Sequence, residues 1–115
     1  MQNFESLRVW QDARKLVADI YSNSTGFPKE ENFGLLLQIK RAAISIASNL
    51  AEGSARHGQK DKAHFYAIAY SSLMELKCQL IIAEDLGFNS SELSKHYTTE
   101  LEKIARQISR LRSSV

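Results

Sequence analysis

The sequence predicts an all-α protein that folds as an antiparallel up-down-up-down four-helix bundle, a single domain over residues 1–115. Three observations support this prediction. Apolar residues recur every three or four positions along most of the chain, which is the spacing of one helix face. A single proline and only five glycines leave room for long uninterrupted helices. No alternating run of apolar and polar residues bounded by turn residues indicates a β-strand.

The four helices share this periodicity and are expected at residues 6–22, 28–53, 61–87 and 90–112. Ser6 precedes the first periodic run and is the expected N-cap of the first helix. Trp10 is expected to anchor the core between helices. Pro28 suits the first position of the second helix, because its missing N–H costs nothing there. Gly53 is expected to end that helix as a left-handed C-cap.

Gly87 ends the third helix, and Asn89 with Glu92 resembles a capping box at the start of the fourth. Apolar residues of the fourth helix fall on one face at spacings of three and four, as in coiled-coil packing. They are Leu93, Tyr97, Leu101, Ile104, Ile108 and Leu111. This face is expected to close the bundle core.

The stretch from Gln38 to Gly53 is apolar or small on most of its surface, apart from one polar line. The line consists of Gln38, Arg41, Ser45, Ser48, Asn49 and Glu52. One interpretation is a solvated helix face. The other is a packing and assembly motif between helices or subunits, since short serine and asparagine side chains suit close contact and buried polar groups need partners. Which side of this helix would meet a neighbouring subunit stays open.

The formal net charge is only +2, but the excess of basic residues falls in residues 54–64 and 89–115. The candidate phosphate-binding residues there are Arg56, Lys60, Lys62, Lys95, Lys103, Arg106 and Arg110. One interpretation is structural, since basic residues stabilise the negative end of the fourth helix dipole and pair with acidic neighbours. The other is contact with nucleic-acid phosphates, which would be independent of sequence and sensitive to salt.

No motif for catalysis, cofactor binding or metal binding stands out. The sequence has no phosphate-cradling glycine loop, nucleophile elbow or HExxH motif. His57 and His64 lie seven residues apart without a carboxylate or cysteine at ligand spacing. Cys78 is expected to be a small core residue. We therefore expect no enzyme activity, no cofactor and no metal. The single cysteine, the absence of a secretory signal and the lack of a membrane span favour a cytoplasmic protein.

A longer pattern runs through the second and third helices. It comprises Phe27-Pro28, Glu31, Gly34-Leu35, Gln38, Arg41-Ala42-Ala43, Ser45-Ile46, Ser48-Asn49, Ala51-Glu52-Gly53, Arg56, Phe65, Ala69, Ser72-Leu73, Glu75-Leu76 and Leu86-Gly87-Phe88. The pattern resembles the bacterial four-helix-bundle family encoded in intervening sequences of 23S ribosomal RNA genes. The resemblance covers nearly the whole chain, and its helix 28–53 motif is the most specific part.

The resemblance implies a homopentamer, a barrel of five bundles. A related accessory protein of diversity-generating retroelements binds nucleic acid and a reverse transcriptase through its basic surface. The expected function is therefore a non-enzymatic homo-oligomer that binds RNA or DNA weakly and without sequence preference. The alternative is a protein-interaction scaffold for a partner encoded nearby, such as a reverse transcriptase-like protein, without nucleic-acid binding.

Overall fold

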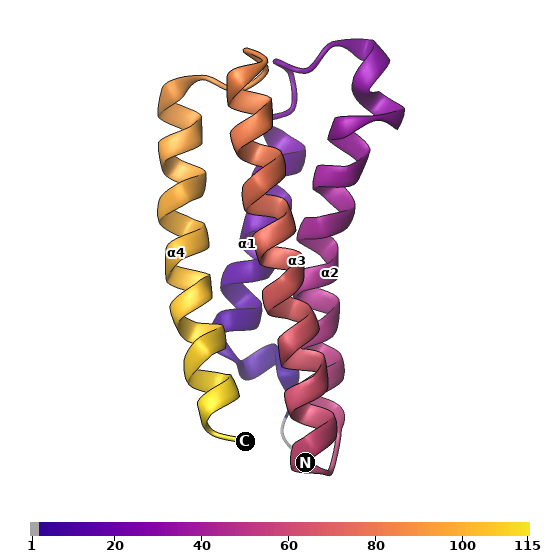
Figure 1. Ribbon diagram of the computed structural model, residues 1–115, viewed down its shortest axis with the longest axis vertical. Helices are drawn as coiled ribbons and strands as arrows, with labels where there is room; N and C mark the ends of the chain where they lie inside the picture. The colour runs from indigo at the N-terminus through magenta and orange to yellow at the C-terminus, as the bar shows by residue number, and fades with distance from the viewer. Residues whose placement is uncertain (1–2) are drawn as a thin grey trace.

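Four α-helices form the computed structural model of the protein, which describes residues 3–115. The helices are α1 (Arg8–Ser22), α2 (Leu35–Ala55), α3 (Gln59–Asp85) and α4 (Ser91–Ser113), with short 3₁₀-helices η1 (Phe4–Ser6) and η2 (Lys29–Phe33). They run alternately up and down, side by side, in an elongated body of 44 × 25 × 20 Å (Figure 1). Residues 3–115 contain no β-strand, and the predicted antiparallel four-helix bundle is confirmed.

The core follows the predicted periodicity. All four helices contribute side chains that are at most 1% exposed, namely Leu16, Ile39, Ile46, Leu50, Leu73, Leu76, Ile104 and Ile108. The predicted apolar face of α4 is confirmed, since Tyr97 and Leu101 are also buried, and Leu93 and Leu111 pack partly buried against the core. Trp10 packs at the edge of this core, where it meets the ring of Phe4 edge to face.

The first helix begins later than predicted. Ser6 lies in η1, where its hydroxyl donates to the carbonyl of Asn3 at 2.8 Å, so it does not cap α1. The side chain of Asn3 accepts the backbone N–H of Glu5 and starts this separate turn. Leu7 then takes an extended conformation, and α1 starts at Arg8 without a side-chain cap. The sequence signal at Ser6 marked a turn rather than the helix start.

The second helix also begins later than predicted. Pro28 precedes η2, and α2 begins only at Leu35. The carboxylate of Glu31 folds back to accept the backbone N–H of Leu35 at 2.9 Å. Gly34 makes room for this, because a Cβ there would lie 2.7 Å from Glu31 Oε1. A side chain in η2 therefore satisfies the first turn of α2.

Gly53 does not end α2, contrary to the prediction. The helix continues to Ala55, and Gly53 is buried within it. A Cβ at this position would lie 2.6 Å from Cε1 of Tyr66 and 3.2 Å from Cβ of Phe65. The missing side chain lets α2 and α3 approach closely at this end, and these two helices share the most extensive packing in the bundle.

The third and fourth helices are shifted slightly from their predicted bounds of 61–87 and 90–112. Gly87 follows the end of α3, which confirms the prediction that it terminates the helix, and the structure adds that it does so in the left-handed conformation, with φ +80°. The N-cap of α4 is Ser90, whose hydroxyl accepts the backbone N–H of Leu93 at 3.1 Å. The predicted capping box of Asn89 and Glu92 is therefore wrong. Asn89 is instead a buried residue of the connection between α3 and α4.

Tyr97 makes the stability of the bundle depend on pH in the alkaline range. Burial, with a smaller contribution from the carboxylate of Asp19, raises the pKa of Tyr97 to about 12 from the ordinary value of 10. Between these pH values the unfolded chain loses the tyrosine proton while the folded chain keeps it. The stabilisation that Tyr97 provides in its protonated form is therefore fully present below pH 10. We expect about 3 kcal/mol of unfolding free energy to be lost as the pH rises through 12.

Urea denaturation at a series of pH values from 8 to 12 measures this loss, and Tyr97→Phe is the matched control. The phenylalanine variant should lose less stability over the same range. Some dependence should remain in it, since burial also raises the pKa of Tyr66. Identical pH profiles for the two proteins would show that Tyr97 does not titrate with folding.

Candidate nucleic-acid interface

One end of the bundle collects basic side chains. The alternating helix directions bring the start of α1, the α2–α3 connection and the end of α4 to the lower end in Figure 1. This lower end holds seven basic and three acidic side chains, which come from residues 4–8, 52–64 and 106–115. The opposite end, formed by residues 19–33 and 84–96, holds two basic and six acidic ones. The basic residues of the lower end, called the basic end below, are Arg8, Arg56, Lys60, Lys62, Arg106, Arg110 and Arg112.

Arginines line open hollows at the basic end. Arg8 and Arg110 line one of about 350 Å³, together with Leu7, Val9, Gln107, Leu111 and Ser114. Arg112 lines another of about 440 Å³, with Ala63, Ser109 and Ser113. Within residues 3–115, no carboxylate lines either hollow. Arginine side chains in such open concavities suit bidentate contact with phosphate oxygens.

Aromatic rings orient two of these arginines. The guanidinium carbon of Arg56 lies 4.6 Å from the ring centroid of Phe65, and that of Arg112 lies 5.4 Å from the ring of Tyr70. Such cation–π contacts restrict the side chain while leaving its N–H groups available. Arg56 also pairs with Glu52 at 3.1 Å, but both side chains are about half exposed, so this pair contributes little and is easily exchanged.

Not every predicted phosphate-binding residue is available at this end. Lys62 donates through Nζ to the carbonyls of Gly53 at 3.3 Å and Ser54 at 3.1 Å, so it satisfies the end of α2. Lys103 lies along α4 and pairs with Glu100 at 3.0 Å. Its Nζ is also 3.9 Å from Asp12, a buried carboxylate of α1 that accepts a hydrogen bond from Gln107.

The other predicted residues divide by position. Lys95 lies in the first turns of α4, at the opposite end of the bundle and about 22 Å along the helix from Arg110. Arg106 and Arg110 are exposed one turn apart near the end of α4, and Lys60 is exposed in the first turn of α3. The structure thus brings Arg56, Lys60, Arg106 and Arg110 to one end.

Sequence reasoning missed two members of this cluster. Arg8 and Arg112 are not among the residues that the charge pattern of the sequence predicts. The predicted topology contained the signal, since an up-down-up-down bundle places the start of the first helix beside the end of the last. Combining the topology with the charge pattern would have identified both residues.

The polar line of α2 divides between the two predicted interpretations. Ser45 Oγ and Ser72 Oγ lie 2.8 Å apart in a hydrogen bond between α2 and α3. Asn49 donates through Nδ2 to the carbonyl of Ser45 at 2.9 Å and to its hydroxyl at 3.1 Å. Ser45 and Asn49 therefore belong to a seam within the bundle. The remaining members are exposed, namely Gln38, Arg41, Ser48 and Glu52.

Histidines and the cysteine do not gather into a site. In the part of the chain that the structure describes, no group of three or more His, Cys, Asp or Glu side chains could hold a metal ion. His57 and His64 are exposed near the basic end, whereas His96 bonds to Asp19 at 3.0 Å. Cys78 is exposed, so its predicted place in the core is wrong. The apolar composition of α3 misled that prediction, because apolar residues also cover its outer face.

The helices of residues 3–115 are too short or too polar to cross a membrane.

The family model for 23S rRNA-intervening sequence proteins matches residues 5–110. A solved structure with the same fold comes from Bacteroides thetaiotaomicron and is described as a protein of unknown function from the S23 ribosomal protein family. It has a TM-score of 0.83 and 16% sequence identity, covering 91% of this chain and 95% of that one. No curated protein matches the chain.

Proposed function

Because this chain belongs to the 23S rRNA-intervening sequence protein family, we propose that it acts as a homo-oligomer that binds RNA or DNA phosphates without sequence preference. The proposal includes no catalytic step. The observation that carries it is the collection of basic side chains at one end of the bundle, with arginines in open hollows free of carboxylates. A cytoplasmic location is part of the proposal, since an exposed free thiol suits a reducing compartment.

The uneven charge distribution explains how a chain of net charge +2 can attract a polyanion. The acidic residues of the opposite end lie a bundle length away, in a body 44 Å long. That distance exceeds the screening length of roughly 8–10 Å at physiological salt, so a phosphate chain at the basic end is little affected by them. A ring of parallel copies, such as a pentamer, would place every basic end on one face and multiply the local potential.

Exposed apolar side chains support the homo-oligomer. Four apolar side chains in α3 and at its C-cap are 40 to 57% exposed, namely Met74, Ile81, Ile82 and Leu86, and Ile44 is 42% exposed on α2. Single exposed apolar residues are ordinary, but several along one helix of a small protein indicate a surface that another molecule covers. Size-exclusion chromatography with light scattering tests this part, and a monomer at every concentration up to the millimolar range would refute it.

The basic end is tested with Arg8→Ala combined with Arg110→Ala. We expect this double variant to bind a mixed-sequence single-stranded RNA at least tenfold more weakly than the wild type, equally for all sequences. The slope of log K against the logarithm of the salt concentration should be shallower by about 0.7 for each phosphate that the variant no longer neutralises. Fluorescence anisotropy between 50 and 200 mM salt measures both quantities. Arg56→Ala with Lys60→Ala should act in the same direction.

The matched control removes two basic residues from the opposite end, Lys29→Ala with Lys95→Ala. This variant has the same net charge as the first double variant, so a local site predicts nearly unchanged binding. Equal weakening by both variants would show that only net charge matters. Undetectable binding by the wild type at 50 mM salt would refute the nucleic-acid proposal altogether.

The alternative function is a scaffold for a protein partner encoded nearby, such as a reverse transcriptase-like protein. The exposed apolar side chains of α3 favour this alternative, because a partner could cover them in place of a second copy. Capture of one specific protein that survives nuclease treatment, by a chain that does not bind RNA or DNA, would support the scaffold and contradict the phosphate-binding proposal.

A further inference from the structure

Phe33 is 91% exposed, the highest value among the exposed large apolar side chains of residues 3–115. It is the last residue of η2, which stands out beyond α2 at the upper right of Figure 1. Among the other helices, η2 packs only against α2. A phenylalanine ring in water forgoes about 1.5–3 kcal/mol of burial. The ring is thus presented as a projection that its own bundle does not cover.

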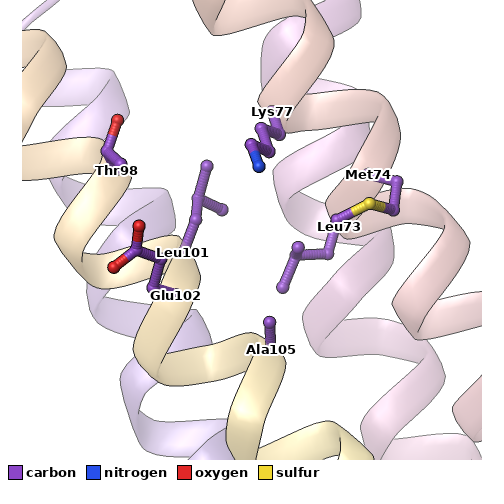
Figure 2. Close-up of a pocket in the computed structure, with 7 residues that line it drawn as sticks. All are labelled: Leu73, Met74, Lys77, Thr98, Leu101, Glu102 and Ala105. Carbon is purple, nitrogen blue, oxygen red and sulfur yellow. The ribbon is translucent and has the colours of Figure 1, made fainter.

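A narrow apolar groove runs between α3 and α4. Figure 2 shows its lower part, where Leu73, Met74 and Lys77 of α3 face side chains of α4. The residues from α4 are Thr98, Leu101, Glu102 and Ala105. A second hollow shares Lys77, Thr98 and Leu101 and continues upward. It adds Leu80, Ile81, Glu84, Ser94 and Tyr97. The two hollows therefore form one continuous groove.

The size of this groove indicates what it can accept. Its two parts have volumes of about 50 and 40 Å³. Sites for drug-sized molecules begin at roughly 300 Å³. A groove this small and apolar suits a protruding side chain of another macromolecule rather than a small-molecule ligand.

Phe33 and the upper groove lie at the same level of the bundle. The Ser45–Ser72 hydrogen bond aligns α2 with α3. Leu35, the first residue of α2 and two positions after Phe33, lies ten residues before Ser45, and Ile82 lies ten residues after Ser72, each about 15 Å higher by helical rise. Glu84 and Ile81 line the upper groove. Copies standing side by side with their long axes parallel would therefore bring one ring level with the groove of the next.

Both features carry charges of both signs, with Lys29 and Glu30 beside the ring and Lys77 and Glu84 in the upper groove. Residues three apart in a 3₁₀-helix eclipse one another, so Glu30 lies on the same side of η2 as Phe33. Lys77 lines both parts of the groove and forms no ion pair within residues 3–115. Docking of the ring can therefore pair Glu30 with Lys77.

We propose that Phe33 of one copy packs into the upper α3–α4 groove of the next copy, beside Ile81 and Leu101. This inference rests on the homo-oligomer proposed above and assigns its surfaces. The projection and the groove are different surfaces, so copies can repeat the contact head-to-tail, which closes a ring where the rotation between copies allows it and otherwise extends as a filament. Glu30 and Lys77 pair at the rim of the contact.

Phe33→Ala tests the projection. Since the ring is 91% exposed, its removal should leave the fold and its helical circular dichroism unchanged. Light scattering after size exclusion should show that the concentration at which the oligomer dissociates rises at least tenfold. Tyr21→Ala is the control, because Tyr21 is another exposed aromatic residue, at 50%. It should assemble like the wild type.

Engineered cysteines test the partner surface. In a Cys78→Ser background, Phe33→Cys with Ile81→Cys should give a ladder of covalent multimers on oxidation. Each single-cysteine variant, and Tyr21→Cys with Ile81→Cys, should stay monomeric on a denaturing gel. An assembled wild type whose Phe33→Ala variant assembles equally well and whose double-cysteine variant gives no ladder would overturn this contact and leave the homo-oligomer standing. A monomeric wild type would overturn both.

Discussion

Replacing Ile46 with alanine is expected to lower the free energy of unfolding by about 3 kcal/mol. Ile46 lies in the middle of α2, is 0% exposed and belongs to the core cluster that all four helices form. Its truncation removes buried methyl groups and leaves a cavity that neighbouring helices fill only partly. Urea denaturation monitored by circular dichroism measures the loss. The protein concentration must be held fixed, because assembly would add to the apparent stability.

Ile44 provides the matched control for this experiment. It is the same residue type, two positions earlier in the same helix, but is 42% exposed. Ile44→Ala removes the same atoms without opening an enclosed cavity, so we expect a loss below about 1 kcal/mol. Equal losses for the two variants would show that the packing of α2 differs from the structure described above.

Gly53→Ala is the second substitution with a large expected effect, a loss of about 2 kcal/mol of unfolding free energy. In an exposed helix the same change would stabilise the protein by about 1 kcal/mol, since alanine favours the helix over glycine. Here the new Cβ would lie 2.6 Å from Cε1 and 2.8 Å from Cδ1 of the buried Tyr66 ring. Relief of this overlap requires the Tyr66 ring to shift within the packed core or α2 and α3 to move apart.

Thermal and urea denaturation of Gly53→Ala measure this loss, and Gly58→Ser is the control. A Cβ at Gly58 meets nothing within 4 Å, and Gly58 is the N-cap of α3, where serine is favourable. The control should therefore match the wild type or exceed it slightly. A further variant, Gly53→Ala with Tyr66→Leu, should lose less than the sum of the two single changes, because the overlap is shared. A Gly53→Ala variant more stable than the wild type would contradict this prediction. It would mean that Gly53 only lowers the helix propensity of α2 and is not needed for the packing of Tyr66.

Local rules failed at the helix boundaries for a common reason. Ser6, Pro28 and Gly53 each carry a strong propensity for a helix end, and none of them ends or begins an α-helix in the structure. The propensity of a residue describes which backbone conformations it can adopt, whereas tertiary contacts decide which of these conformations it adopts in the folded protein. Glycine at position 53 could have reversed the chain, but its use here is to let the ring of Tyr66 approach.

The charge pattern alone similarly does not identify which basic residues are available to bind a ligand at the candidate site. Lys62, Lys103 and Arg110 look equivalent in the sequence. In the structure, Lys62 bonds to two carbonyls and Lys103 to a carboxylate, while Arg110 lines an open hollow with Arg8. A charged side chain serves a ligand only when its own neighbours do not occupy it, and those neighbours lie on other helices.

The sequence by itself determined the all-α class, the four helices, the buried face of α4 and the end of α3 at Gly87, since each depends on periodicity or on the preference of one residue. Only the tertiary structure decided which basic residues share an end of the bundle and that Ser45 bonds to Ser72. It also decided that the Phe33 ring is exposed to solvent and is not covered by its own bundle. These features depend on the relative level and rotation of helices that are distant in the chain. Side-chain packing across the whole core sets that arrangement, and no local pattern contains it.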